Sequence, residues 1–344
     1  MIEFSLLTAM KMVREPGIFS PIAAFLGKFY NMLFNGIYGN VSAGALGLAI
    51  IVFTLIVKLI LFPLMVKQQK SSFKMQQLQP EMNKIRNKYK DKKDQLSQQK
   101  MAMEIQDLQK ANGVHLMGGC LPLLIQLPIL YALFYIFQNA YVYVDVIGNN
   151  YTDIANVILQ IPEALRVEVF APFAQDIVNT YKIQEGIDLK SLNDVILLVA
   201  NIKADDWTTI LNTLGDSGSA LLPLMDVKNN IETFLTIPLV SKCGLSFPGI
   251  IVPIVAGIST YAQSKIMLMM TSSNTAAAGN DQAMAMTNSM NKMMVYFMPF
   301  MMAFFCINVP AGLGVYWTIS NIFGILQQIF LQKYYKKKLA EGAL

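Results

Sequence analysis

Charged residues are scarce in this chain. Asp, Glu, Lys and Arg make up 14% of its 344 residues, whereas a typical soluble domain carries about 25%. Apolar residue types make up 54% of the sequence, and the mean hydropathy is +0.43. This composition argues against a soluble globular protein and indicates a membrane protein.

Residues suited to metal binding or catalysis are also few. The sequence holds one histidine, His115, and three cysteines, Cys120, Cys243 and Cys306. Their spacing matches neither a zinc site nor a disulfide framework. We find no nucleophile–base pair, no phosphate-binding glycine loop and no carboxylate pair. The sequence therefore predicts a protein that is not an enzyme and that needs no cofactor or metal.

The segments that are poor in charged residues are long apolar runs. As a helix, residues 43–66 would be about 36 Å long, enough to cross a hydrocarbon core about 30 Å thick. Four later stretches predict further spans, at residues 117–143, 248–270, 293–309 and 313–332. The sequence thus predicts an all-α polytopic membrane protein with five transmembrane helices and chain ends on opposite sides.

Lys58 lies inside the first apolar run. The next cation, Lys67, is about 13 Å further along a helix, which is beyond the reach of a lysine side chain. A lysine near the middle of a bilayer costs roughly 2.5–3.5 kcal/mol and usually faces a wet cavity where it has a function. The alternative is a lysine accommodated by local bilayer thinning or by a buried partner.

Basic and acidic residues occupy different segments. Residues 67–112 hold eleven Lys and Arg against five acids, and the tail 333–344 adds four lysines. Residues 144–247 hold six Lys and Arg against thirteen acids. Because basic loops stay in the cytoplasm, the basic segments are predicted to be cytoplasmic and the acidic insert extracellular.

The basic segment, residues 67–116, is predicted to form a cytoplasmic helical hairpin that turns at residues 89–94. Clustered Lys and Arg attract phosphate, so the hairpin and tail are candidate docking sites for a polyanion or a targeting receptor. A solvated loop with no docking role would explain the same charges. The candidate docking residues are Lys84, Arg86, Lys88, Lys92, Lys93, Lys336, Lys337 and Lys338.

The first 42 residues show neither the pattern of a cleavable signal peptide nor an early cysteine for lipid attachment. Apolar residues at helical spacing predict an amphipathic helix over residues 18–38 that lies in the outer membrane interface. A sixth crossing is the alternative. The predicted apolar stripe is Phe19, Ile22, Leu26, Tyr30 and Phe34.

Four segments, in order, resemble the YidC-type membrane protein insertases, specifically the bacterial members that lack a large periplasmic domain before the first core span. They are TLIVKLILFPLMVKQ, KMQQLQPEMNKIRNKY, GGCLPLLIQLPILYALFYIF and MPFMMAFFCINVPAGLGVYWTISNIFGILQQ. The resemblance covers residues 43–143 and 248–333. It implies a five-helix core around a hydrophilic groove in the bacterial plasma membrane, with a basic residue in the first core helix.

Lys58 matches that position, where members commonly carry arginine. This is a departure, because lysine lacks the planar fork that binds a carboxylate through two hydrogen bonds. The other groove positions implied by the resemblance are polar or aromatic, and for each the alternative is a simple hydrogen bond between helices. They are Thr54, Gln126, Gln263, Tyr316, Trp317, Ser320 and Asn321.

The resemblance implies that the protein helps nascent membrane proteins integrate into the bilayer without nucleotide hydrolysis. Its implied partners are nascent membrane proteins, the ribosome, a targeting receptor, the Sec translocon and membrane lipids. Two other functions remain open. One is a small secondary transporter or channel that uses Lys58 as a substrate counter-ion, and the other is a membrane-anchored scaffold that binds through its basic loop.

The acidic insert, residues 144–247, is a second departure, because family members usually connect these two spans more briefly. Apolar periodicity predicts a small helical domain in which the turn GDSGS separates two helices. Its role is not decided by the sequence. The other expected segments are an N-terminal tail and interfacial helix at 1–42, a cytoplasmic loop at 271–292 and the basic cytoplasmic tail at 333–344.

Overall fold

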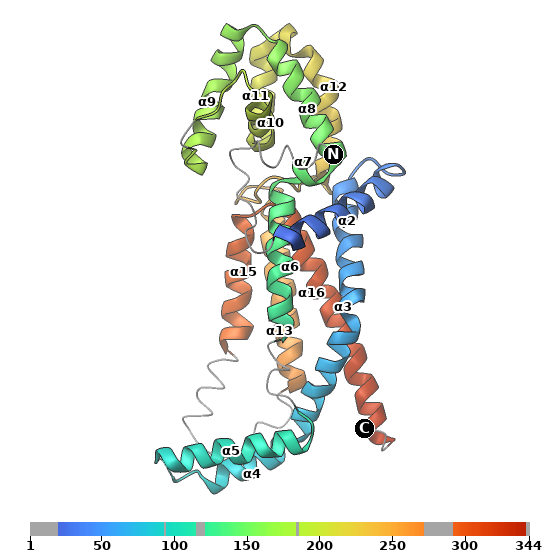
Figure 1. Cartoon of the computed structure of the whole chain (residues 1–344), viewed down its shortest axis with the longest axis vertical. Coiled ribbons are helices and arrows are strands. Elements are labelled where there is room, and N and C mark those ends of the chain that lie inside the picture. Colours follow the sequence, from blue (N-terminus) through green and yellow to red (C-terminus); the bar gives the residue numbers. More distant parts are fainter. Residues whose placement is uncertain (1–19, 93, 115–120, 184–185, 272–291, 342–344) are drawn as a thin grey trace. The chain divides into compact units, whose positions relative to one another are not determined.

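The computed structural model describes residues 20–92, 94–114, 121–183, 186–271 and 292–341, and these are helical over most of their length (Figure 1). His115, Cys120 and Lys93 lie outside the described residues, as does most of the predicted loop at 271–292. The chain divides into two compact units, which we treat separately. The first comprises residues 1–53, 128–252 and 306–316, and the second comprises residues 54–127, 253–305 and 317–344.

Five apolar segments form the long helices. Among the described residues, α3 (Ala45–Gln77) and the Ile251–Met269 part of α13 (Ile251–Thr271) are long and apolar enough to cross a membrane. The others are α6 (Leu121–Gln138), a π-helical turn Met293–Phe297 followed by α15 (Met298–Ile307), and α16 (Ala311–Ala340). Each of these helices, the π-helical turn apart, contributes residues to both units.

Two of these helices continue past the ends predicted for the apolar runs. Helix α3 does not end near residue 66 but runs on to Gln77, and α16 runs on through the basic tail to Ala340. Neither extension contains Gly or Pro, and both are rich in Gln, Lys and other good helix formers. Once a helix is nucleated, such residues propagate it at little cost.

In the first unit, α2 (Ser20–Tyr38) buries one of its faces. Its buried residues are Ala23, Gly27, Tyr30 and Phe34. Gly27 is required by close approach, since a Cβ there would lie 2.4 Å from the Tyr143 ring. Of the predicted apolar stripe, Tyr30 and Phe34 are buried, Leu26 is half-buried, Ile22 is exposed, and Phe19 lies outside the described residues. The position of this helix in the membrane interface stays a prediction.

The acidic insert forms a bundle of helices that we call the insert domain. Its members are α8 (Asp145–Gln160), α9 (Glu163–Tyr181), α10 (Leu192–Asn201), α11 (Ala204–Leu214), the 3-10 helix η3 (Gly215–Leu221) and α12 (Leu222–Glu232). The apolar helix α10 packs against α8 and α9 and is buried along Val195–Val199. The predicted turn GDSGS lies in η3, between α11 and α12.

A short β-hairpin follows the insert domain, and periodicity did not predict it. Strands β1 (Thr233–Phe234) and β2 (Ile237–Pro238) pair antiparallel across the turn residues Leu235 and Thr236. Both turn residues have positive φ, at 49° and 70°. Turns of this kind usually carry Gly, Asn or Asp, so the sequence gives no hairpin signal here.

In the second unit, α4 (Gln79–Lys88) and α5 (Gln95–Ala111) form what we call the basic hairpin. Buried Leu78, Met82 and Val114 form its small apolar core. Asp94 caps α5 by accepting a hydrogen bond from the Ser97 backbone N–H at 2.9 Å. A few buried apolar side chains and one cap hold the pair together, so its helices depend on few contacts.

Candidate functional site

The residues implied to line a groove belong to both units. Tyr316 lies in the first unit, where it is 1% exposed. The other seven lie in the second unit, and three of them, Thr54, Ser320 and Asn321, are buried. Thr54 and Lys58 are one helical turn apart on α3, so both lie on one face of that helix.

Three of the predicted residues meet in what we call the polar cluster. Trp317 and Asn321 lie one turn apart on α16, and Gln263 comes from α13. The sequence interpretation missed two further members, Ser259 and Thr260, which precede Gln263 by about one turn of α13. The signal for them was present in the sequence, because consecutive hydroxyl residues interrupt an otherwise apolar run.

Hydrogen bonds connect the two helices through this cluster. The Trp317 indole N–H donates to Thr260 Oγ1 at 3.0 Å. The hydroxyls of Ser259 and Thr260 donate to the carbonyl of Ala256, one turn back on α13, at 3.0 and 2.7 Å. Every hydroxyl in the cluster is therefore engaged, and the indole is held at a fixed angle to α13.

The Asn321 amide is the centre of the cluster in either of two orientations. In one, its nitrogen donates to Ser259 Oγ at 3.0 Å and to Thr260 Oγ1 at 2.9 Å. In the other, the nitrogen donates to Gln263 Oε1 at 2.7 Å and the oxygen accepts from Trp317 Nε1 at 3.2 Å. Both orientations join α13 to α16 through a buried polar side chain.

Small residues allow the helices of the second unit to approach closely. A Cβ at Gly324 of α16 would lie 2.5 Å from Gln263 Nε2, and one at Gly257 of α13 would lie 3.1 Å from the Cβ of Ala303 on α15. Small residues at helix contacts are typical of packing inside membranes. Gly324 thus sets the distance at which Gln263 can reach the polar cluster.

Lys58 differs from the polar cluster in its surroundings. It is partly exposed, and its neighbours Leu59 and Ile60 are 60% and 67% exposed. Within the part of the chain that the structure describes, no carboxylate forms an ion pair with Lys58. The ammonium group therefore carries an uncompensated charge along an apolar helix.

Pro63 adds a second polar feature beside Lys58. It lies inside α3 and has no backbone N–H. An N–H at that position would have bonded the carbonyl of Leu59, the residue after Lys58. One turn of α3 therefore carries both a cation and a carbonyl that lacks its usual helical donor.

The candidate docking lysines of the basic hairpin are not equivalent. Lys84 and Lys92 are exposed, whereas Lys88 pairs with Glu104 of α5 at 2.7 Å. The Tyr89 hydroxyl donates to the same Glu104 oxygen at 2.8 Å. The hydrogen bond from Lys88 lowers the pKa of Glu104, and the same bond raises the pKa of Lys88. Lys88 joins the two helices, so it is a weaker docking candidate than Lys84.

The tail lysines lie on the last turns of α16. Lys336 and Lys337 are exposed and Lys338 is half-buried. Lys337 is 3.9 Å from Glu341, one turn on. Positive charge at a helix C-terminus is stabilised by the helix dipole. Just before Lys336, the Tyr335 hydroxyl donates to the carbonyl of Val66 at 3.0 Å, so α16 is bonded to α3 at this point.

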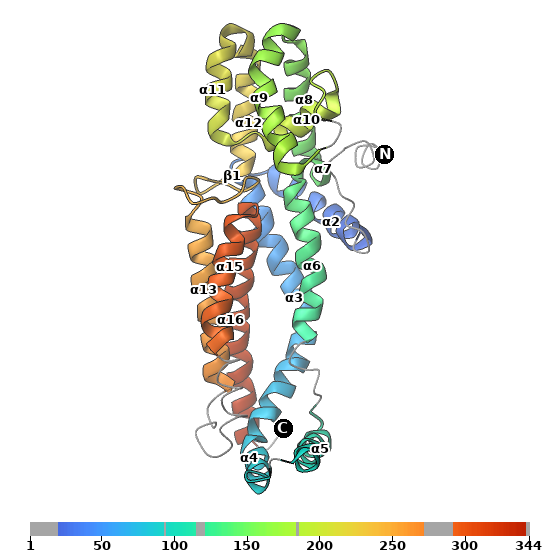
Figure 2. The same cartoon turned by 90° about the vertical axis from the view of Figure 1, so that its left-hand side faces the viewer.

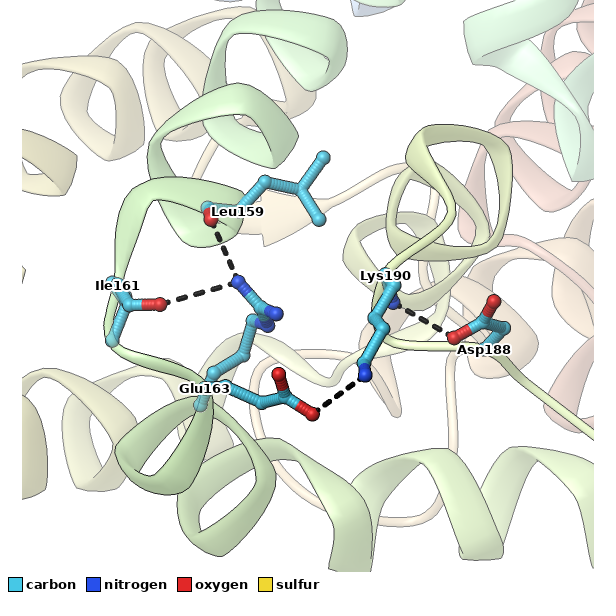
Figure 3. A network of polar contacts seen from close by, with 6 residues as sticks. Leu159, Ile161, Glu163, Asp188 and Lys190 are labelled. Atoms are coloured by element: carbon cyan, nitrogen blue, oxygen red, sulfur yellow. Dashed lines mark hydrogen bonds and ion pairs between the residues drawn. The ribbon is translucent and has the colours of Figure 1, made fainter.

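The insert domain holds its own buried charges, and their contacts are structural. Arg166 donates to the carbonyls of Leu159 and Ile161 at 2.7 and 3.2 Å, at the end of α8. On the surface, Lys190 pairs with Glu163 at 2.7 Å (Figure 3). Among the described residues, no group of three or more His, Cys, Asp and Glu side chains could hold a metal ion.

A second buried group lies between α8 and α12. The Tyr151 hydroxyl donates to Glu232 at 2.6 Å, and Lys228 pairs with the same carboxylate. The Lys228 ammonium also lies 5.0 Å from the centre of the Tyr151 ring. Each charge of this pair is thus compensated by a neighbour, and the group joins the beginning of the insert domain to its end.

Comparison with known proteins gives a consistent result. The family model described as 60Kd inner membrane protein matches residues 37–338. Membrane protein insertase YidC 2 of Bacillus anthracis is 30% identical over 295 residues, which cover 86% of this chain and 75% of that protein. Membrane protein insertase MisCA of Bacillus subtilis (strain 168) is 30% identical over 286 residues, covering 83% of this chain and 70% of that protein. Membrane protein insertase YidC 1 of Halalkalibacterium halodurans is 29% identical over 294 residues, covering 86% and 72%.

Proposed function

This chain belongs to the 60Kd inner membrane protein family, and we infer that it is a membrane protein insertase of the YidC type. The observation that carries this conclusion is the family match over residues 37–338, which includes all five apolar segments. We propose that nascent membrane proteins are its clients and that it works in the bacterial plasma membrane.

The proposed topology has five crossings, made by α3, α6, α13, the Met293–Ile307 segment and α16. Helices α3 and α13 support it most directly because they are long and apolar enough to span. The remaining three are apolar but shorter or more polar. The charge difference between the basic hairpin and the insert domain supports a cytoplasmic hairpin, a cytoplasmic tail and an extracellular insert domain.

We propose that Lys58 and the polar cluster line a hydrophilic groove, together with Thr54, Gln126, Tyr316 and Ser320. Two observations support a wet surface at Lys58. The side chain is partly exposed on an apolar helix, and no carboxylate among the described residues pairs with it. An ionisable residue inside a membrane usually faces a water-filled cavity or the interior of the helix bundle.

The mechanism follows from the cost of moving polar groups through lipid. A client helix must carry its short polar tail across a core where each unsatisfied polar group costs several kcal/mol. A wet, positively charged groove shortens the dry part of that path, and Lys58 gives acidic tail residues a transient partner. Burial of the client's apolar segment in lipid then drives completion. No nucleotide is consumed in this scheme.

Reconstitution in vesicles of pure lipid tests the function. Vesicles that contain the protein should integrate a single-spanning client with a short acidic outer tail in the absence of Sec components. We expect Lys58→Leu to lower the yield about fivefold or more, since even in bulk water a charge pair at 4 Å contributes about 1 kcal/mol. Lys58→Arg should retain most of the activity.

Lys100→Leu is the matched control, because it removes one positive charge from the exposed surface of α5 rather than from α3. It should integrate this client like the unmodified chain. If Lys58→Leu also integrates the client normally, the role of the charge is disproved while the insertase function stands. Solute flux without client integration would instead support a transporter.

We further propose that the basic hairpin and the end of α16 receive the ribosome and a targeting receptor, and that the protein cooperates with the Sec translocon. Exposed Lys84, Lys92, Lys336 and Lys337 support docking of a polyanion. Arg86 supports it less, because it donates to Asn83 Oδ1 at 3.1 Å. Binding through such lysines should weaken steeply as salt is raised.

A further inference from the structure

Three large apolar side chains in the first unit are exposed to an unusual degree. Leu235, Leu245 and Phe247 are 77%, 72% and 79% exposed, the highest values among the described large apolar residues. We call them the apolar triad. They belong to two short segments, the turn between β1 and β2 and the loop that leads into α13 (Figure 2). Among the described residues, helix surfaces also expose large apolar side chains, of which Phe25 on α2 reaches 71%.

In the first segment, the residues on either side of the turn are held by packing. Its neighbour Phe234 packs so closely on α3 that a Cβ at Gly47 would lie 2.2 Å from the Phe234 ring. Ile237 and Leu239, which follow the turn, are buried. Leu235 itself has a φ of 49°, a left-handed conformation that is costly for a branched side chain. The chain thus accepts both a conformational cost and full exposure at one leucine, which indicates a role outside the folded unit.

The second segment is also held by its backbone. The N–H of Cys243 donates to the carbonyl of Val309 at 3.3 Å, and the N–H of Gly244 donates to the carbonyl of Ile307 at 3.1 Å. Leu245 follows directly, and Phe247 precedes the first residue of α13 by four positions. This loop is therefore bonded to the connection between α15 and α16.

Both segments meet at the same place. The N–H of Gly312, at the beginning of α16, donates to the carbonyl of Leu239 at 2.8 Å, so the β-hairpin also lies against this connection. The apolar triad is consequently grouped around the ends of α13, α15 and α16 within the first unit. These are the ends from which the proposed membrane crossings begin.

We propose that the apolar triad inserts into the extracellular leaflet of the bilayer and anchors these two segments in lipid. The proposal rests on the proposed topology, because α13 must cross the membrane for the preceding loop to lie at its surface. Lipid is the occupant that the geometry favours. The three apolar side chains lie beside the ends of helices that are proposed to enter the membrane, and two of them, Leu235 and Leu245, are each followed by a polar residue, Thr236 and Ser246, that suits the headgroup region.

Spin-label accessibility in the full chain tests the proposal. Single cysteines replace Leu235, Leu245 and Phe247 in a chain with Cys120, Cys243 and Cys306 changed to Ala, reconstituted in phosphatidylglycerol–phosphatidylethanolamine vesicles. We expect each label to collide more often with oxygen, which concentrates in lipid, than with a water-soluble nickel chelate. A parallel set keeps the native cysteines, of which Cys243 and Cys306 are buried, in case the altered chain does not fold.

Two control positions test this proposal separately from the proposed topology on which it rests. A label at Ile258, which is 63% exposed within α13, should report lipid, and one at exposed Asp216 in η3 should report water. If Ile258 reports lipid while the triad labels behave like Asp216, the lipid anchor is disproved and the topology stands. If Ile258 reports water, both are disproved. Triad labels shielded from both reagents would reveal a protein partner and would also overturn the anchor.

Discussion

Asn321 and Lys58 place polar atoms in apolar helices by different means. Asn321 is buried and each orientation of its amide has hydrogen-bond partners on α13, so its polarity is satisfied internally. Lys58 is partly exposed and has no carboxylate partner among the described residues, so its polarity has to be satisfied from outside. The first arrangement holds helices together, and the second is suited to a passing client.

Replacing Asn321 with Ala should therefore loosen the contact between α13 and α16. Hydrogen bonds between helices inside a membrane contribute about 0.6 kcal/mol each on average, so we expect a loss of roughly 1 kcal/mol for the two bonds. Thermal unfolding in detergent measures it. Gln327→Ala, on the same helix and half-buried, is the control, and an equal shift in both variants would contradict the structural role of the cluster.

Arg166 gives a sharper prediction in the insert domain. Hydrogen bonds to a charged group contribute about 1.5–3 kcal/mol, and Arg166→Met leaves two carbonyls at the end of α8 without their donor. We expect the domain to lose about 2–3 kcal/mol of stability in urea, followed through the fluorescence of buried Trp207.

The surface pair in Figure 3 provides the comparison for Arg166. Lys190→Met breaks the exposed contact with Glu163 and should cost less than about 1 kcal/mol, as surface ion pairs do. If Lys190→Met destabilises the domain as much as Arg166→Met, the assignment of Arg166 as a structural donor is wrong.

At the scale of elements, the basic hairpin should respond to acid. The pKa of Glu104 is lowered in the folded hairpin by its hydrogen bond from Lys88. Its contribution to stability is therefore complete above the ordinary carboxyl pKa of about 4.3 and is lost as the pH falls through the lower folded value. Amide hydrogen exchange in α4 and α5 should become faster between neutral pH and pH 3, after correction for intrinsic rates.

Glu104→Gln is the control for this effect. The variant lacks the ionisable group, so its hairpin should show fast exchange already at neutral pH and a smaller change on acidification. An unchanged pH response in Glu104→Gln would mean that another group controls the hairpin. The pair between Lys88 and Glu104 would then have no measurable effect on folding.

The long helices could be predicted from the sequence, whereas several of their details could not. Apolar runs predicted the long helices, and the family resemblance was confirmed by the comparisons. Helices α3 and α16 are longer than the spans predicted for them, because hydropathy locates lipid contact, whereas a helix continues wherever good helix formers can propagate it. Periodicity alone could not tell that the Tyr143 ring leaves room only for a glycine at position 27. Ser259 and Thr260 were missed although their hydroxyls interrupt an apolar run, because the sequence does not show which helix they face.

At the scale of the whole molecule, the insert domain is joined to the rest through neighbouring ends. Tyr151 near its beginning donates to Glu232 at its end. We expect a chain in which residues 149–229 are replaced by a six-residue Gly-Ser linker, which can span about 20 Å, to fold and to integrate a short-tailed client at no less than about half the normal rate. Vesicle integration and circular dichroism measure this. Loss of integration with retained helicity would show that the domain acts on clients.

The nearness of those ends also bears on how such a chain could arise. A block of sequence whose first and last residues meet can enter a gene in one event without displacing the helices on either side of it. Selection can then modify the block on its own, because changes inside it need no compensating change in the flanking segments. Related chains would accordingly be expected to differ most in the segment between α6 and α13.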